Sequence, residues 1–306
     1  MMNKSLPIQL KSCFLAIVFG AVVFTGCKKE EETPEVTTPV KEGPGVPVVP
    51  ASNQYVTKLF DYVPAPGQFV NTDIANMTGA QSILGKMGGI VSLGAWGGYI
   101  VLGFDHTVVN QPDKDDIMVY GNAFPNFSEP GIVWVMNDAN GNGLPDDTWY
   151  ELAGSEYGKD GYVRNYEVTY SRPDTLITRD VPWKDNKGVT GSVETVAFHK
   201  QLYYPKWITA NQYTLKGSIL SAKNVDKTDP TYVFSMPLAW GYADNLVGGN
   251  PVDIANAIDS NGKKVVLKGI DFIKVQTGVM ANMGWLGELS TEVLGVADIS
   301  LLKPGN

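Results

Sequence analysis

The stretch GYIVLGF at positions 98–104 decides the fold. Four of its seven residues are β-branched or aromatic, the side chains that β-strands favour. Further along the chain, similar short segments lie at 117–120 (IMVY) and 132–136 (IVWVM), separated by Gly, Pro, Asn and Asp. These separating residues end one strand and turn the chain into the next. The pattern therefore predicts neighbouring strands of a β-sheet.

Further strand-like segments recur along the chain. They read YEVTY, TYVFSM, KVVL and FIKVQ, at 166–170, 231–236, 264–267 and 272–276. Helical patterns are short and few, and we expect helices only at 74–86, 252–258 and 287–294. Many short strands with turn signals predict a mainly β protein, specifically a jelly-roll-like β-sandwich with few short helices.

Residues 155–227 are less regular than the rest of the predicted domain, which spans 55–306. They contain several Pro-centred breaks, such as Arg172-Pro173 and Val181-Pro182. We interpret this segment as a long loop-rich insertion at one end of the sandwich. Long ordered loops on a rigid scaffold often carry a binding site.

The first residues read as a secretory signal. Lys4 and Lys11 supply a basic start, and residues 14–24 form an apolar core too short to remain as a membrane anchor. The sequence FTGC at 24–27 follows, and it resembles the lipobox that lipoprotein signal peptidase reads. We predict a signal peptide at 1–26 and a bacterial lipoprotein lipidated at Cys27. The alternative is an incidental cysteine after an ordinary signal.

Residues 27–54 are predicted to form a lipidated, disordered tether. Two Lys and three Glu follow the cysteine, and the next residues are rich in Pro, Val, Thr and Glu. This composition has too few aromatic residues to bury a core. The acidic run resembles the signal that sends Bacteroidota lipoproteins to the outer face of the outer membrane, although a solvated spacer would read similarly. We expect a lipid anchor in the outer membrane and a domain that faces outward.

Composition excludes several classes of function. The net charge of -8 and the pI near 4.9 argue against nucleic acid, whose recognition needs basic patches. The two cysteines are Cys13, inside the predicted signal, and Cys27. The predicted domain therefore contains no thiol, which excludes disulfides, cysteine–zinc sites, iron–sulfur clusters and thiol nucleophiles from it.

The sharpest local motif is DANGNGLPDD at 138–147. Calcium takes six to eight oxygen ligands, which a tight loop can supply. The candidate ligands follow the spacing of an EF-hand-type loop; they are Asp138, Asn140, Asn142, the Leu144 carbonyl, Asp146 and Asp147. Trp149 replaces the bidentate Glu of such loops, and Asp147 or Glu151 is the expected substitute. The alternative is an Asn/Gly-rich hairpin turn without an ion.

Six other acids lie beside predicted strands. They are candidates for a second structural ion site, or they face water and cap turns; they are Asp105, Asp115, Asp116, Glu129, Asp253 and Asp271.

Aromatic residues fall into two groups. One group lies in or beside predicted strands, where we expect core positions: Trp96, Trp134, Trp149 and Trp240. The other lies in Pro-rich loops: Trp183, Tyr203, Tyr204 and Trp207. We predict that the second group forms an exposed platform that stacks on a sugar face or a flat macrocycle. The alternative is that these four side chains fill a small core of the insertion itself.

The sequence gives little support for catalysis. The only histidines are His106 and His199, and no Gly-x-Ser-x-Gly elbow is present. A glycoside hydrolase needs two carboxylates across a cleft, and any acidic protein offers such candidates, here Glu129, Glu151 and Glu156. We therefore expect a protein that binds rather than one that catalyses.

Three segments carry a resemblance to a known family. The first runs from Ser92 to Asp105 (SLGAWGGYIVLGFD). The second combines DIMVYGNAF at 116–124 with SEPGIVWV at 128–135. The third comprises WGYADN at 240–245, VDI at 252–254 and GIDFIKV at 269–275. Apart from the insertion, residues 92–278 resemble a secreted β-sandwich family known mostly as "cell surface protein" of Bacteroidota, which is similar in outline to galactose-binding-like jelly rolls.

The resemblance implies a location and a fold more than a reaction. Some members are encoded near outer-membrane cobalamin receptors, which implies a corrinoid (vitamin B12) ligand and a TonB-dependent receptor as partner. With the predicted aromatic platform, the sequence favours a non-catalytic surface lipoprotein that binds a nutrient ligand, a glycan first and a corrinoid as the alternative. A glycoside hydrolase or lyase is the alternative from another class.

Overall fold

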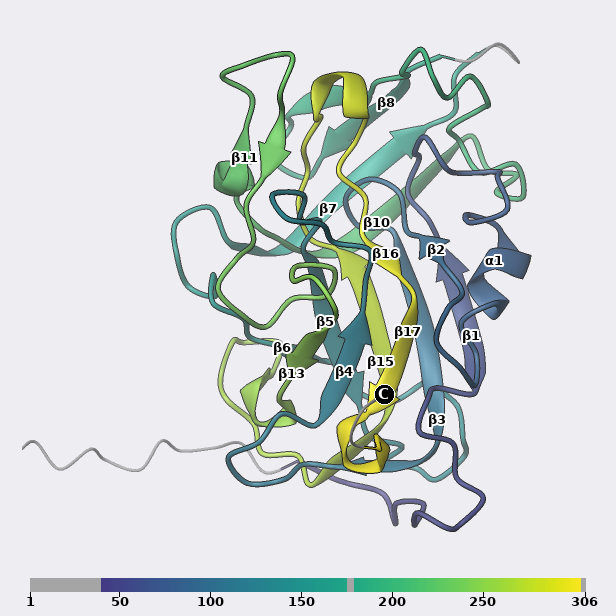
Figure 1. The fold of residues 1–306 in the computed structure, drawn as a ribbon, viewed down its shortest axis with the longest axis vertical. Helices are drawn as coiled ribbons and strands as arrows, with labels where there is room; N and C mark the ends of the chain where they lie inside the picture. Colours follow the sequence, from purple (N-terminus) through teal and green to yellow (C-terminus); the bar gives the residue numbers. More distant parts are fainter. Residues whose placement is uncertain (1–39, 175–178, 304–306) are drawn as a thin grey trace, which may run out of the picture. The chain divides into compact units, whose positions relative to one another are not determined.

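Strand β3 (Tyr99–Val109), which contains all but the first residue of the stretch GYIVLGF, lies inside the largest sheet of the computed structural model (Figure 1). This sheet has six antiparallel strands in the order β1-β3-β15-β5-β6-β14. The other strands are β1 (Lys58–Val63), β5 (Gly131–Met136), β6 (Tyr150–Leu152), β14 (Ala257–Ile258) and β15 (Gly269–Thr277). The mainly β class predicted from the sequence is confirmed.

The structure describes residues 40–174 and 179–303. The chain divides into residues 1–36 and a unit of residues 37–306, and every described residue belongs to that second unit. The predicted signal peptide and the lipidation site at Cys27 lie outside the described residues. Within them, no helix is long and apolar enough to cross a membrane.

One face of the large sheet forms the main core. Successive side chains of a strand point to opposite faces, so every second residue shares a face. Ile100 and Leu102 of β3 pair with Val275 and Ile273 of β15, and all four side chains are fully buried. This alternation fixes the register, because a shift by one residue would turn the apolar set toward the other face.

Two small sheets cover this apolar face. One has the order β13-β4-β17 and the other pairs β16 with β2. Their strands are β2 (Val91–Ser92), β4 (Ile117–Tyr120), β13 (Asn250–Val252), β16 (Glu292–Val293) and β17 (Gly295–Asp298). Ile117, Val119 and Val296 are fully buried in the same core cluster as Ile100. The arrangement is consistent with a β-sandwich, while jelly-roll connectivity stays a prediction.

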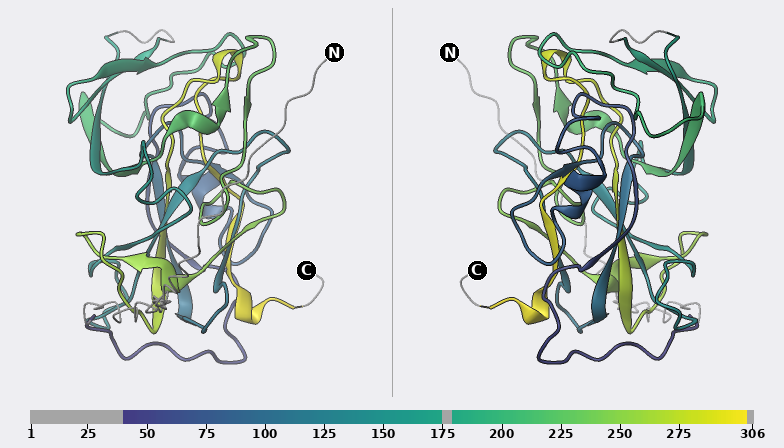
Figure 2. Two further views of the ribbon diagram at one scale, coloured as in Figure 1. Left: turned by 90° about the vertical axis from the view of Figure 1, so that its left-hand side faces the viewer. Right: turned by 90° about the vertical axis from the view of Figure 1, so that its right-hand side faces the viewer.

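The insertion at 155–227 differs from the expected set of loops, because it contains a four-stranded antiparallel sheet. The order is β10-β7-β8-β9, built from β7 (Val163–Ser171), β8 (Val181–Asp185), β9 (Thr190–Val193) and β10 (Gln212–Ile219). This sheet lies toward the upper end of the long strands in Figures 1 and 2. It has its own core, in which the ring of buried Trp96 meets Tyr166 edge-on at 4.9 Å.

Helices contribute little, as expected, but their positions differ from the prediction. The segment 74–86 contains only α1 (Met77–Gln81), and 252–258 contains a 3-10 turn, η2 (Ile254–Asn256). The segment 287–294 is not helical, since it contains β16. The remaining short elements are η1 (Ala222–Asn224), β11 (Val225–Asp226), β12 (Phe234–Ser235), η3 (Gly284–Leu286) and η4 (Ile299–Leu301).

The end of the predicted tether packs against the domain. Val46 N–H donates to Thr107 Oγ1 at 2.7 Å, and Thr107 N–H donates back to the Val46 carbonyl at 2.8 Å. Gly43 N–H donates to Asn137 Oδ1 at 2.7 Å. The domain therefore begins before Tyr55, because these polar backbone groups find partners on β3 and at the end of β5.

Candidate functional site

A cavity of about 480 Å³ lies where several loops meet near the start of β5. We call it the acidic pocket. The loop between β4 and β5 contributes to it, as do the segment around η3 and the loop after β9. Its lining combines aromatic rings with carboxyl groups: Gln68, Phe69, Asn122, Phe124, Phe127, Ser128, Glu129, Phe198, His199, Ser235, Met283, Trp285, Leu286, Glu288 and Glu292.

Three aromatic side chains of the acidic pocket are exposed. Phe124 is 64% exposed, Phe198 77% and Trp285 51%. Large apolar side chains of this kind are usually buried, and a group of them around a cavity is typical of a binding site. Phe69 adds a fourth ring to the lining and packs edge-on against His199, with 5.0 Å between ring centroids.

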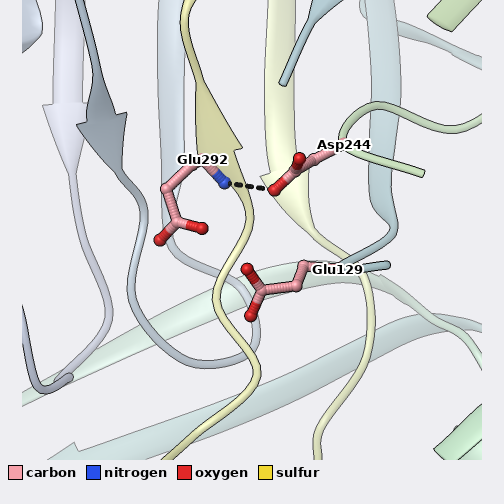
Figure 3. A group of neighbouring side chains, drawn as sticks. All are labelled: Glu129, Asp244 and Glu292. Atoms are coloured by element: carbon pink, nitrogen blue, oxygen red, sulfur yellow. Dashed lines mark hydrogen bonds between the residues drawn. The ribbon is translucent and has the colours of Figure 1, made fainter. Parts of the chain in front are cut away.

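Three carboxyl groups gather at the floor of the acidic pocket. They belong to Glu129, Asp244 and Glu292, and one oxygen of each lies within 4.8 Å of the others (Figure 3). Glu129 and Glu292 line the cavity, whereas Asp244 does not. They form the only such group of His, Cys, Asp or Glu side chains in the part of the chain that the structure describes.

Hydrogen bonds hold the three carboxyl groups in place. Asp244 Oδ1 accepts from Asn122 N–H at 2.6 Å, and Asp244 Oδ2 accepts from Glu292 N–H at 2.8 Å. Ser290 connects the other two, since its N–H donates to Glu129 Oε1 and its hydroxyl donates to Glu292 Oε1, each at 3.0 Å. The local backbone thus fixes acids that are far apart in sequence.

The acids of this group hold their protons more tightly than ordinary carboxyl groups do. Burial raises the pKa of Glu129 well above its usual range, and the negative charge of Glu292 raises it further. Burial and the charge of Glu292 likewise raise the pKa of Asp244. Burial also raises the pKa of Glu292. Such shifts gather at functional sites because charge placed in a poorly solvated position is costly.

Glu288 adds a fourth carboxyl group to the lining. It is 4% exposed, and its Oε1 accepts from Gln68 N–H at 2.8 Å. Its Oε2 is buried and has no hydrogen-bond partner in the described structure. Burial raises the pKa of Glu288 to about 8, with a smaller contribution from Glu292. An unpaired buried oxygen is rare and calls for an explanation, such as a ligand.

Hydrogen bonds link several candidate ligands of the predicted calcium loop to one another. Asp138 accepts three backbone hydrogen bonds, from Gly141, Asn142 and Gly143. The side-chain amides of Asn140 and Asn142 both donate to Asp146, at 3.0 Å from the nearest oxygen. These bonds lower the pKa of Asp146.

Asp147 and Leu144 also take part in hydrogen bonds within the loop, whereas Glu151 lies away from it. Asn140 N–H donates to Asp147 Oδ2 at 3.3 Å, and Leu144 N–H donates to Asn142 Oδ1 at 2.8 Å. Glu151 does not reach the loop, because Tyr162 and Ser218 donate to its carboxylate inside the domain. Of the two expected substitutes for the bidentate Glu, only Asp147 therefore lies at the loop. Calcium binding itself stays a prediction.

The predicted aromatic platform is not exposed as a unit. Tyr203 and Tyr204 are 1% and 4% exposed and belong to the core of the insertion sheet, and partly buried Trp183 packs against the same core. Trp207 is 40% exposed but stacks on Tyr62, with 6.3 Å between centroids. The expectation of a platform is therefore corrected for the two tyrosines, because the insertion buries them to build its own core.

The remaining predicted residues are dispersed. His106 lies between Asp105 and Asp298, at 2.7 and 3.0 Å, whereas His199 lines the acidic pocket. Of the six acids considered for a second ion site, only Glu129 belongs to the cluster of three carboxyl groups at the pocket floor. Trp240, expected in the core, is 50% exposed.

Sequence reasoning missed most of the acidic pocket. Asp244, Glu288 and Glu292 were not singled out, and neither were Phe124, Phe198 and Trp285. No protein-family model and no curated protein matches the chain.

Proposed function

We propose that this protein is a non-catalytic lipoprotein of the outer membrane that captures a nutrient glycan in the acidic pocket. The predicted lipidation at Cys27 and the tether support a position at the cell surface. The observation that supports a glycan ligand is that exposed aromatic rings and carboxyl groups line the same cavity. Aromatic rings stack on the apolar faces of sugars, and carboxyl groups bond to their hydroxyls.

The size of the acidic pocket supports a short glycan. Its volume of about 480 Å³ falls within the range of roughly 300–1,000 Å³ that is usual for small-molecule sites. The resemblance to Bacteroidota cell surface proteins supports a corrinoid as the second ligand, delivered to a TonB-dependent receptor. A corrinoid exceeds this cavity, so the exposed rings would take only one face of the macrocycle.

The test is ligand binding by the full-length protein in detergent. A glycan panel and cobalamin are screened by thermal shift, since a ligand at about a hundred times its Kd stabilises the folded state by about 2.7 kcal/mol. We expect Trp285→Ala to weaken binding of the glycan hit about tenfold or more, as a central aromatic contact does. Trp240→Ala is the matched control, because Trp240 is equally exposed and does not line the acidic pocket.

Two results would overturn the proposal. One is that no glycan shifts the melting temperature. The other is that Trp285→Ala and Trp240→Ala weaken the hit equally, which would place the ligand elsewhere. A Trp207→Ala variant shows whether the half-exposed ring predicted from the sequence contributes instead.

A glycoside hydrolase is the second candidate, and one observation favours it. Glu129, a carboxyl group that holds its proton, lies beside Glu292 in the same cavity. Retaining glycosidases place their two carboxyl groups about 5–5.5 Å apart. The glycan hit is therefore incubated with the protein and its reducing ends are counted. Turnover that Glu129→Gln abolishes, with binding retained, would establish the enzyme and overturn the non-catalytic proposal.

A further inference from the structure

We propose that Glu129, Asp244 and Glu292 bind one divalent cation, Ca²⁺, at the floor of the acidic pocket. This site is separate from the predicted loop at 138–147. Binding of the ion by these three side chains does not depend on which ligand enters the pocket.

The spacing of the three carboxyl groups fits one calcium ion. Ca²⁺ binds oxygen at about 2.3–2.6 Å, so two ligand atoms on opposite sides of the ion lie about 4.6–5.2 Å apart. One oxygen from each of the three side chains lies within 4.8 Å of the others. A single ion between them is therefore within reach of all three side chains after small side-chain rotations.

The ligands are held in place before the ion arrives. Asn122 and Glu292 N–H groups fix the Asp244 carboxylate, and Ser290 fixes the two Glu side chains. Each of these oxygens keeps a lone pair beyond the hydrogen bond it accepts. Oxygen-only donor sets favour Ca²⁺, Mg²⁺ and Mn²⁺, and Mg²⁺ demands a stricter octahedron with several waters.

The second observation is the unpaired oxygen of Glu288. This side chain is 4% exposed, lines the same cavity as Glu129 and Glu292, and leaves Oε2 without a hydrogen-bond partner among the described residues. Leaving such a group unsatisfied is unfavourable, and more so when it carries charge. A cation in the acidic pocket places positive charge near this carboxyl group, and a water molecule coordinated to the ion is a hydrogen-bond partner for Oε2.

The ion also has a consequence for the ligand, and this step rests on the proposed function. Glu129 is partly exposed and both Glu side chains line the cavity. Three carboxylates leave coordination positions open on the cavity side, since Ca²⁺ takes six to eight oxygens. Two neighbouring hydroxyls of a sugar can fill them while the ring stacks on Trp285 or Phe198.

Calorimetric titration of Ca²⁺ into the full-length protein in detergent, without any glycan, tests the ion site. We expect Glu292→Gln and Asp244→Asn each to remove one binding event or to weaken it about tenfold or more. Asp146→Asn is the matched control, because it alters only the loop at 138–147 and should retain that event. Melting curves in chelator verify that each variant is folded, and Glu129→Gln serves if Asp244→Asn does not fold.

Either of two outcomes overturns the ion site. The first outcome is that the wild type binds no Ca²⁺, Mg²⁺ or Mn²⁺. The second is that Glu292→Gln binds the same number of ions as the wild type, with the same affinity. Glycan binding is then measured with Ca²⁺ and with chelator. Ion binding without any glycan hit refutes the proposed function alone, whereas a glycan hit that is unaffected by chelator refutes the bridging role of the ion.

Discussion

Gly121 lies directly against Asp244. A Cβ atom at position 121 would meet Asp244 Oδ1 at 2.3 Å and Asp244 Cα at 2.6 Å. Asp244 cannot move away freely, because Asn122 and Glu292 N–H groups bind its carboxylate and its carbonyl accepts from Glu129 N–H at 2.9 Å. The close approach of a bare backbone thus lets the carboxyl group of Asp244 sit behind the pocket floor.

We expect Gly121→Ala to destabilise the protein and to weaken ligand and ion binding together. The added methyl group must displace Asp244, and overpacking of this kind costs about 1–3 kcal/mol. Urea unfolding measures the loss. Gly295→Ala is the control, since a Cβ there meets its nearest atom at 3.5 Å, an ordinary contact. Equal stability of the two variants would show that Asp244 tolerates displacement.

Stability should fall as pH rises, and Glu288 should account for part of the fall. Its pKa is about 8 in the folded protein against 4.5 as the ordinary value. Between these values the unfolded chain loses the proton that the folded chain keeps, so the folded state loses stability as pH increases. The slope from one such group is at most about 1.4 kcal/mol per pH unit.

The measurement is urea unfolding at pH 5 and pH 8 in chelator. Glu288→Gln cannot ionise, so its difference in unfolding free energy between the two pH values should be smaller than that of the wild type. A remaining slope is expected, because Glu129, Asp244 and Glu292 also have raised pKa values. Identical slopes would mean that Glu288 is ionised in the folded protein.

The strands were the part of the fold that local sequence could predict. The segment 117–120 matches β4, and 132–136 lies within β5 (Gly131–Met136), because buried strands need β-branched and aromatic side chains at period two. The segment 264–267 forms no strand, although its composition is similar. Strand propensity depends on a partner, and Lys264 makes only an isolated bridge to Ile258.

The acidic pocket could not be predicted in the same way. Glu129 stood out as an acid beside a strand, but Asp244 and Glu292 lie 115 and 163 positions further along. The bridge between Gly131 and Ala243 brings Asp244 beside Glu129, and the hydrogen bond from Glu292 N–H to Asp244 adds the third acid. The calcium motif was visible because all its candidate ligands lie within one turn of the chain.

Gln276 should be important for the attachment of the insertion sheet to the large sheet. It is fully buried on β15, and its amide donates to the Gly97 carbonyl at 2.9 Å and to the Lys216 carbonyl of β10 at 3.0 Å. Gln276→Ala leaves both carbonyls without this donor and should cost about 2–3 kcal/mol in urea unfolding. Gln212→Ala, at an exposed position of β10, is the control. If both variants unfold at the same urea concentration, the amide does not join the sheets.

Calcium should also stabilise the protein through the loop at 138–147. The side-chain amides of Asn140 and Asn142 both donate to the carboxylate of Asp146, and rotation of these amides would turn their oxygens toward an ion bound beside Asp146. Added Ca²⁺ should therefore raise the melting temperature of Glu292→Gln, in which the pocket site is removed, and chelator should reverse the rise. Asp146→Ala placed on Glu292→Gln should abolish the effect, whereas Asp160→Asn, an exposed acid outside the loop, should not. The contrary outcome is that Ca²⁺ stabilises the Asp146→Ala double variant as strongly as it stabilises Glu292→Gln. In that case the motif is a hairpin turn whose carboxylates accept hydrogen bonds from amides of the same turn, and the ion binds elsewhere.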